Sequence, residues 1–185
     1  KNLGLDKYSS IFGSTVFAFG GFSAMWLEWG TILHTGLWLP LVLLAIDKMI
    51  LNSNKRSQLI KWSLIFIFSM SAALFAGHLQ TFIYIDVFVF IYFLARLYQS
   101  RNKKFLISIV VLYIFVLLIT AIQTIPTFNL INLSARSLDQ VNWQKEGWFL
   151  PYEHLAQFIV PDFFGNPTTL NYWGAWNYGE LTAYV

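Results

Sequence analysis

The sequence predicts an all-α protein: a polytopic membrane bundle of about five transmembrane helices, followed by an outer, partly helical region rich in aromatic residues. Hydrophobic residues make up 57% of the chain and charged residues only 11%, against the roughly 25% charged that is usual in a soluble domain. The apolar residues form long runs, and most basic residues lie between them. Backbone in lipid must hydrogen-bond internally, so each run is expected to be a helix.

Five apolar runs are long enough to cross, or nearly cross, a bilayer. They cover residues 11–27, 35–51, 62–75, 82–95 and 105–125. The last run is expected to stop at Pro126, because proline lacks the amide hydrogen that a helix uses. Gly20 and Gly21 predict a bend or a close helix contact in the first run. The expected division is a transmembrane bundle over residues 1–126 and an extracytoplasmic loop or interfacial region over residues 127–185.

The basic residues predict the orientation of the bundle. With the amino end in the cytoplasm, every lysine and arginine except Arg136 and Lys145, ten of the twelve, lies on the cytoplasmic side. The outer face then holds residues 28–34, the hairpin tip at residues 77–81 and everything after Pro126. The basic pI of about 9.1 is therefore a topology signal and does not indicate a nucleic-acid partner.

Several kinds of chemistry have no motif in the sequence. The chain contains no cysteine, so disulfides and thiolate metal sites are excluded. There is no phosphate-cradling glycine loop, nucleophile elbow or HExxH motif, and a histidine without other ligands at metal spacing predicts no metal site. Because the chain starts at Lys1 and stops at Val185 inside an aromatic-rich run, it is expected to be a segment of a longer protein.

A polar island between the third and fourth runs is the first candidate site. It reads Ala76-Gly77-His78-Leu79-Gln80-Thr81 and predicts the tip of a membrane hairpin. His78 and Gln80 either cap helix ends and meet water, or contact a ligand. A neutral imidazole or a carboxamide at the membrane boundary suits a phosphate group or a sugar hydroxyl.

An acidic residue is expected inside the membrane. Asp86 follows His78 by eight residues, which places it roughly 12 Å deeper on an ideal helix. A carboxylate at that depth is costly, so Asp86 is expected to face the bundle, either protonated or bonded to Ser69 or Ser71 of the preceding helix. Asp86 either acts as a functional acid or forms a structural hydrogen bond between helices.

Further candidates lie on the outer face. Glu28 lies in a short outer loop and is either an interfacial residue or part of a site. Arg136 lies outside against the charge bias, and its guanidinium suits a phosphate group or an ordinary lipid headgroup. The aromatic tail suits the faces and hydroxyls of a carbohydrate, or alternatively a membrane-interface belt. Its candidate binding residues are Tyr172, Trp173, Trp176, Tyr178 and Glu180.

Residues 152–160 predict a short amphipathic helix lying on the membrane surface. Leu155, Phe158 and Ile159 would face the lipid, and Glu153 and Gln157 would face water.

Four short motifs stand out along the chain: Trp38-Leu39-Pro40-Leu41, the Ala76-to-Thr81 island, Leu133-Ser134-Ala135-Arg136-Ser137, and the tail from Pro161-Asp162 to Tyr178-Gly179-Glu180. Together they resemble the bacterial YfhO-type membrane proteins, which are grouped with the C-type glycosyltransferase superfamily. The resemblance covers most of the chain, although Leu79 stands where that family commonly has proline.

The resemblance implies an enzyme that transfers a sugar from a polyprenyl-phosphate carrier to a glycan acceptor on the outer face, beside the membrane lipid. The general base of such enzymes is usually an acidic residue in the first outer loop, which this chain is expected to lack; Glu28 is the candidate substitute. His78 and Arg136 would bind the phosphate, and the aromatic tail would hold the sugar. These residues are therefore expected to converge on one outward-facing cavity. Some relatives use a divalent cation and others do not, so the cofactor stays open.

Two other classes stay open. A transporter or flippase for lipid-linked sugars would need an intramembrane acid such as Asp86 and a polar path between helices. A non-catalytic membrane scaffold would need none of the polar residues at the hairpin tip.

Overall fold

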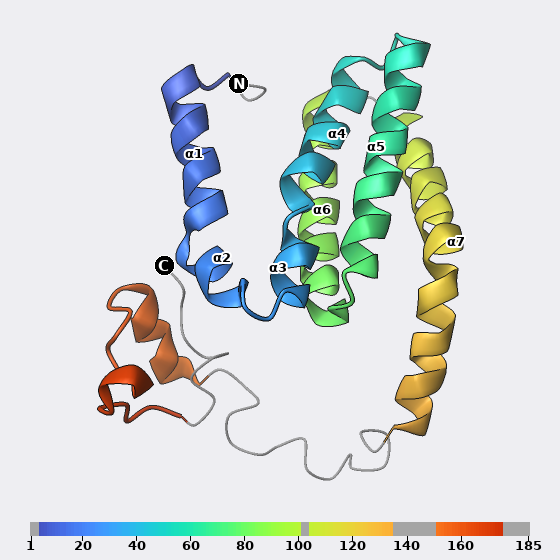
Figure 1. Ribbon diagram of the computed structural model, residues 1–185. Coiled ribbons are helices and arrows are strands. Elements are labelled where there is room, and N and C mark those ends of the chain that lie inside the picture. Colours follow the sequence, from blue (N-terminus) through green and yellow to red (C-terminus); the bar gives the residue numbers. More distant parts are fainter. Residues whose placement is uncertain (1–3, 101–103, 135–150, 176–185) are drawn as a thin grey trace. The chain divides into compact units, whose positions relative to one another are not determined.

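The computed structural model describes residues 4–100, 104–134 and 151–175 (Figure 1). Every regular element in these ranges is a helix, which confirms the predicted all-α class. The chain divides into two units, which are described separately. Unit 1 comprises residues 1–10 and 26–127, and unit 2 comprises residues 11–25 and 128–185.

Four helical segments among the described residues are long and apolar enough to cross a membrane. They correspond to the second to fifth predicted spans. The first of them, Thr31–Leu51, consists of α3 (Thr31–Gly36) followed by α4 (Leu39–Leu51). The others are α5 (Arg56–Phe75), α6 (Leu79–Ser100) and α7 (Lys104–Leu133), whose apolar part is Phe105–Leu133.

The first predicted span is not one helix. It is divided into α1 (Lys7–Phe19) and α2 (Gly21–Trp26), and neither is long enough to cross a bilayer. A Cβ atom at Gly20 would lie 2.6 Å from the Val16 carbonyl oxygen, so only glycine fits this turn. Ser23 Oγ donates to the Phe17 carbonyl at 2.8 Å across the break. The predicted bend is therefore confirmed, and the first apolar run is not among the four helical segments of the described residues that could cross a membrane.

The predicted helix stop at Pro126 is also wrong, because α7 continues through this proline to Leu133. Threonine hydroxyls bond to the backbone on both sides of it. Thr124 Oγ1 donates to the Thr120 carbonyl at 3.1 Å, and Thr127 Oγ1 donates to the Gln123 carbonyl at 2.8 Å. Such hydroxyls help a membrane helix to tolerate proline, because water is not there to bond the backbone.

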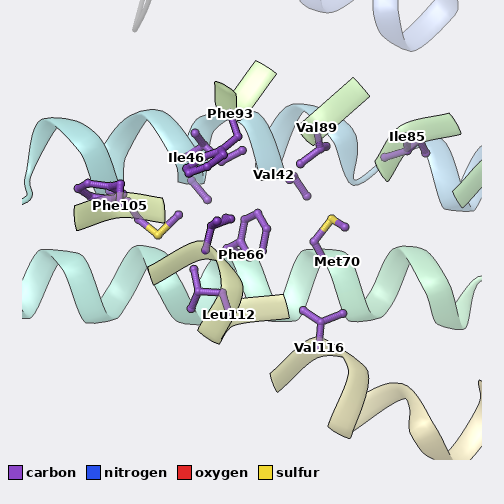
Figure 2. Close-up of a cluster of buried hydrophobic side chains, with 13 residues drawn as sticks. Val42, Ile46, Phe66, Met70, Ile85, Val89, Phe93, Phe105, Leu112 and Val116 are labelled. Atoms are coloured by element: carbon purple, nitrogen blue, oxygen red, sulfur yellow. The ribbon is translucent and has the colours of Figure 1, made fainter. Parts of the chain in front are cut away.

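The core of unit 1 lies where α4, α5, α6 and α7 face one another (Figure 2). Its residues recur every three or four positions, so each helix buries one face. The opposite faces expose large apolar side chains such as Leu64, Phe90 and Leu118, as expected for helices in lipid. The buried set comprises Val42, Ala45, Ile46, Met49, Phe66, Met70, Ile85, Val89, Phe93, Phe105, Ile109, Leu112 and Val116.

Unit 1 has two chemically different ends. At the first, α4 and α6 end and α5 and α7 begin; we call it the basic end, because it carries Lys48, Lys55, Arg56 and Arg96. At the second, called the tip end, lie the turn before α3 and the turn between α5 and α6 (Figure 1). Residues 27–36 and 75–84 contain no lysine or arginine. The prediction that the tip end faces outward depends on this asymmetry.

Candidate functional site at the hairpin tip

The reversal between α5 and α6 takes three residues, Ala76, Gly77 and His78. Gly77 has a φ of +91°, a backbone conformation that L side chains rarely adopt. Its amide donates to the Leu74 carbonyl at 3.0 Å, which satisfies one of the last carbonyls of α5. The tight turn places His78 directly at the start of α6.

His78 caps the amino end of α6. Its carbonyl accepts the first helical hydrogen bond, from the Phe82 amide at 3.0 Å. Its Nδ1 atom accepts from the Thr81 amide at 3.2 Å and lies 2.8 Å from Thr81 Oγ1. This is the capping role that the sequence left as one alternative. A capping side chain satisfies an amide that otherwise has no partner in the helix.

The cap also fixes the tautomer of the His78 ring. A backbone amide can only donate, so Nδ1 must carry a lone pair, and the neutral ring must hold its hydrogen on Nε2. The Thr81 hydroxyl then also donates to Nδ1. The half-buried His78 ring therefore presents an Nε2–H donor on the side away from the cap. A donor beside a helix amino end suits an anion.

The turn before α3, which contains Glu28, lies at the same end of unit 1 as the start of α6, which contains Gln80 and is preceded by His78; Figure 1 shows these turns. Gln80 is exposed, and its Nε2 donates to Tyr84 Oη at 3.0 Å along α6. Glu28 is exposed in the turn before α3, a helix that packs against both α5 and α6. The structure thus brings Glu28, His78 and Gln80 to one end of the bundle, as the predicted topology requires.

Asp86 faces its neighbouring helices, as predicted, but its predicted partner is wrong. Its Oδ1 accepts a 2.6 Å hydrogen bond from Tyr113 Oη on α7. Ser69 and Ser71 are buried on α5, and neither hydroxyl has a hydrogen-bond partner among the described residues. The Tyr113 ring also packs edge-on against Phe66 of α5, at 5.7 Å between centroids. Tyr113 therefore joins three helices around the acid.

A second polar cluster, which the sequence analysis missed, lies near the basic end. Arg96 Nε on α6 donates to Asp47 Oδ1 on α4 at 2.6 Å, forming a salt bridge. Tyr92 Oη donates to the same oxygen at 3.0 Å. Asp47 is buried, whereas Arg96 keeps one edge accessible and donates from Nη1 to Gln99 Oε1 at 2.7 Å. The sequence signal for this pair was an acidic residue near the end of the second predicted span, Asp47, and a basic residue directly after the fourth, Arg96.

The described part of the aromatic tail forms a small cluster in unit 2. Phe164 is buried, and its ring lies 4.6 Å from that of Trp173 and 5.1 Å from that of Phe163. The Trp173 amide donates to the Phe164 carbonyl at 3.0 Å, and Tyr172 Oη donates to the Ala175 carbonyl. Trp173 keeps much of its ring exposed, as a sugar-stacking residue would need.

The helix predicted at residues 152–160 forms as a 3₁₀ helix, η2 (Tyr152–Phe158). Gln157, predicted to face water, is fully buried; Glu153, Leu155, Phe158 and Ile159 are exposed. The error lies in the helical period. With three residues per turn instead of 3.6, Gln157 aligns with buried His154 rather than with Glu153.

The remaining predicted site residues, Arg136, Trp176, Tyr178 and Glu180, lie outside the described residues. His78 belongs to unit 1 and the tail to unit 2, so their convergence on one cavity stays a prediction. Among the residues that the structure describes, no group of three or more His, Cys, Asp or Glu side chains could hold a metal ion.

Comparison with known proteins gives one match. The model of a family described as bacterial membrane protein YfhO matches residues 1–177. No curated protein and no solved structure matches the chain.

Proposed function

Since this chain belongs to the YfhO family of bacterial membrane proteins, we propose that it transfers a sugar from a polyprenyl-phosphate donor to a glycan acceptor on the outer face of the membrane. It is an integral membrane protein with four helices able to cross a bilayer among its described residues. The observation that carries the proposal is the capping role of His78, whose Nδ1 accepts from the Thr81 amide and whose Nε2–H donor therefore lies at the end of a membrane hairpin.

The phosphate of the donor is the group that the hairpin tip suits best. In the proposed complex, His78 Nε2–H donates to a phosphate oxygen, and the positive end of the α6 dipole adds to the attraction. A lipid phosphate lies at the membrane boundary, which is where the tip of a membrane hairpin lies. Arg136 is proposed to complete the phosphate site with a bidentate guanidinium contact.

The proposed reaction is an inverting displacement. The acceptor hydroxyl oxygen attacks the anomeric carbon, and the bond from that carbon to the phosphate oxygen breaks. The hydroxyl proton passes to a carboxylate, for which Glu28 is the candidate within this chain, and polyprenyl phosphate leaves with the bonding electrons. His78 and Arg136 stabilise the negative charge that develops on the leaving phosphate. Tyr172, Trp173, Trp176, Tyr178 and Glu180 are proposed to hold the sugar.

Two substitutions of His78 separate the cap from the donor. His78→Asn keeps an oxygen near the Nδ1 position, and asparagine is a good amino-terminal cap, but it removes the Nε2–H. His78→Gln places an amide N–H near the Nε2 position and loses the cap. If the donor matters, His78→Asn lowers sugar transfer by about 100-fold, as for other lost transition-state donors, and His78→Gln retains most of it.

The assay follows radiolabelled sugar from a panel of polyprenyl-phosphate sugars into an acceptor fraction, with the intact protein in native membranes. Insertion and abundance are measured for each variant. Equal transfer by the His78→Asn variant and the unmodified protein, or no transfer from any donor, would contradict the proposal.

A second candidate, transport of lipid-linked sugars, is favoured by polar groups inside the bundle. Asp86 and Tyr113 form a hydrogen-bonded pair there, and the hydroxyls of Ser69 and Ser71 are buried without a hydrogen-bond partner among the described residues. Intramembrane polar groups of this kind often mark a substrate path. Reconstitution in sealed vesicles distinguishes the two functions: a transporter moves the intact donor across the bilayer, whereas a transferase separates the sugar from its carrier.

A further inference from the structure

Helix η2 has its polar and apolar sides inverted relative to a helix on a soluble domain. Residues three apart in a 3₁₀ helix align in rows. One row, which we call the apolar row, comprises Tyr152, Leu155 and Phe158, exposed by 89, 48 and 62%. The row of His154 and Gln157 is exposed by only 3 and 0%. A helix in contact with water on its outer side would show the opposite arrangement.

The buried polar row is held mainly through His154, because the Gln157 Nε2 atom is buried without a hydrogen-bond partner among the described residues. His154 stacks on Phe164 at 4.2 Å between ring centroids, with an interplanar angle of 14°. The Ala175 amide donates to His154 Nε2 at 3.3 Å, which leaves Nδ1 as the donor to Gln157 Oε1 at 3.3 Å. Both imidazole nitrogens are therefore engaged, and the apolar row must lie outward.

A second exposed apolar residue lies in the loop that follows. Leu170 is 94% exposed and has a φ of +57°, the left-handed region that favours glycine or asparagine. The loop around it is fixed by Asn171 Oδ1, which accepts from the Asn166 amide at 2.9 Å and from Thr169 Oγ1 at 2.7 Å. A large apolar side chain is thus presented outward by an ordered loop, at a position where glycine would fit more easily.

We propose that residues 152–175 dock into the headgroup region of the lipid bilayer through the apolar row and Leu170. The lipid-binding surface consists of Tyr152, Leu155, Phe158 and Leu170, and none of these four residues belongs to the proposed sugar site. Buried apolar area holds such an element in the interface plane, and amphipathic rings such as that of Tyr152 are enriched at that depth.

Lipid is the occupant because of where this segment lies in the chain and how it is charged. Residue 151 follows the end of the membrane helix α7 by 18 positions (133 to 151), so it can lie no more than roughly 60 Å from that end. The bilayer is therefore always within reach. Residues 151–175 contain Glu153 and Asp162 but no lysine or arginine. Docking is consequently driven by apolar contact and does not need anionic lipid.

Single spin labels test the proposal directly, because none of these 185 residues is a cysteine that would compete with an introduced one. Phe158→Cys and Leu170→Cys place a label on the proposed lipid surface. Glu153→Cys, on another row of η2, and Thr168→Cys, on the same loop as Leu170, are the matched controls. All four positions are exposed, so the labels displace no buried side chain. Each labelled variant of the intact protein is placed in nanodiscs of pure phosphatidylcholine.

The measured quantity is the accessibility of each label to oxygen, which concentrates in lipid, relative to a water-soluble nickel chelate. The proposal predicts that oxygen dominates at positions 158 and 170 and that nickel dominates at positions 153 and 168. Adding phosphatidylglycerol should leave these ratios unchanged.

Three results would overturn the proposal. Nickel could dominate at positions 158 and 170, which would place the surface in water. The two labels could be shielded from both reagents, which would indicate a protein contact. Oxygen could dominate only when phosphatidylglycerol is present, which would show that apolar contact does not drive the docking.

Discussion

The two ends of unit 1 use polar side chains in different ways. Near the basic end, Asp47 on α4 bonds to Arg96 and Tyr92 on α6, which lie 49 and 45 residues away in the sequence. At the tip end, the side-chain hydrogen bonds of His78 and Gln80 reach residues only three or four positions away. The first set joins helices to one another, whereas the second set organises a single helix end.

This difference separates polar groups that join helices from polar groups that bond within one helix. A buried ion pair between helices is costly to break, because its loss leaves a charge without a partner. Polar groups that bond only along their own helix contribute little to helix packing, and they remain able to bond to a ligand. We therefore expect that the tip end is where a polar molecule would bind without disturbing the fold.

The largest effect is expected from breaking the buried pair. Asp47→Ala leaves the Arg96 guanidinium without its carboxylate and should lower the free energy of unfolding by about 3 kcal/mol. This value lies at the lower end of the stability losses seen when a buried ion pair is broken, because Arg96 keeps its hydrogen bond to Gln99 and is partly exposed. Titration with sodium dodecyl sulfate, followed by circular dichroism, measures the change.

Lys48→Ala is the matched control, because it removes a charge next to Asp47 on the same helix and is expected to change stability by no more than about 0.5 kcal/mol. If both variants were equally stable, the two ends of the bundle would not differ in the way described.

The sequence predicted the helical class, four of the five spans and the turn at the hairpin tip. These features depend on local patterns: apolar runs, glycine at a reversal and polar residues between runs. It predicted the bend at Gly20 but not that the first run divides into two short helices, and it failed at Pro126. Both outcomes depend on neighbouring groups. Gly20 ends a helix because the chain turns tightly there, and α7 continues past Pro126 because the membrane setting favours a continuous helix.

The side-chain partners could not be predicted from the sequence, because they depend on how the helices rotate against one another. Asp86 was expected to bond to Ser69 or Ser71 on the adjacent hairpin helix, yet its partner is Tyr113 on α7. The sequence analysis did include the capping of α6 by His78 as one of its two alternatives, because a polar side chain at a helix start can bond to the free backbone amides there. Its role in ligand binding stays a prediction.

A smaller loss of stability is expected inside the bundle. Tyr113→Phe removes the hydroxyl that donates to Asp86 and should cost about 1–3 kcal/mol, the penalty of leaving a polar group unsatisfied. Asp86→Asn keeps an oxygen to accept that bond and should cost less. The same detergent titration compares the two variants. Unchanged stability in Tyr113→Phe would show that this hydrogen bond does not hold α6 against α7.

The smallest effect is expected at the hairpin turn itself. Gly77→Ala meets no atom within 4 Å, so its cost comes only from the positive φ, about 1 kcal/mol of unfolding free energy. Gly13→Ala lies within α1, is also free of close contacts and should be slightly stabilising. Thermal unfolding of both variants in the same nanodiscs makes the comparison. If Gly77→Ala lowered the free energy of unfolding as much as Asp47→Ala does, the hairpin tip would contribute to the stability of the core.

The central claim is that the tip end binds phosphate without being needed for the fold. Native mass spectrometry of a polyprenyl monophosphate bound to the unmodified protein and to the His78→Asn variant, together with detergent titration of both, tests it most directly. We predict that His78→Asn weakens binding about tenfold, through loss of one donor to a charged group. Its unfolding free energy should stay within about 0.5 kcal/mol, because asparagine still caps α6. Unweakened binding, or a loss of stability like that of Asp47→Ala, would contradict the claim.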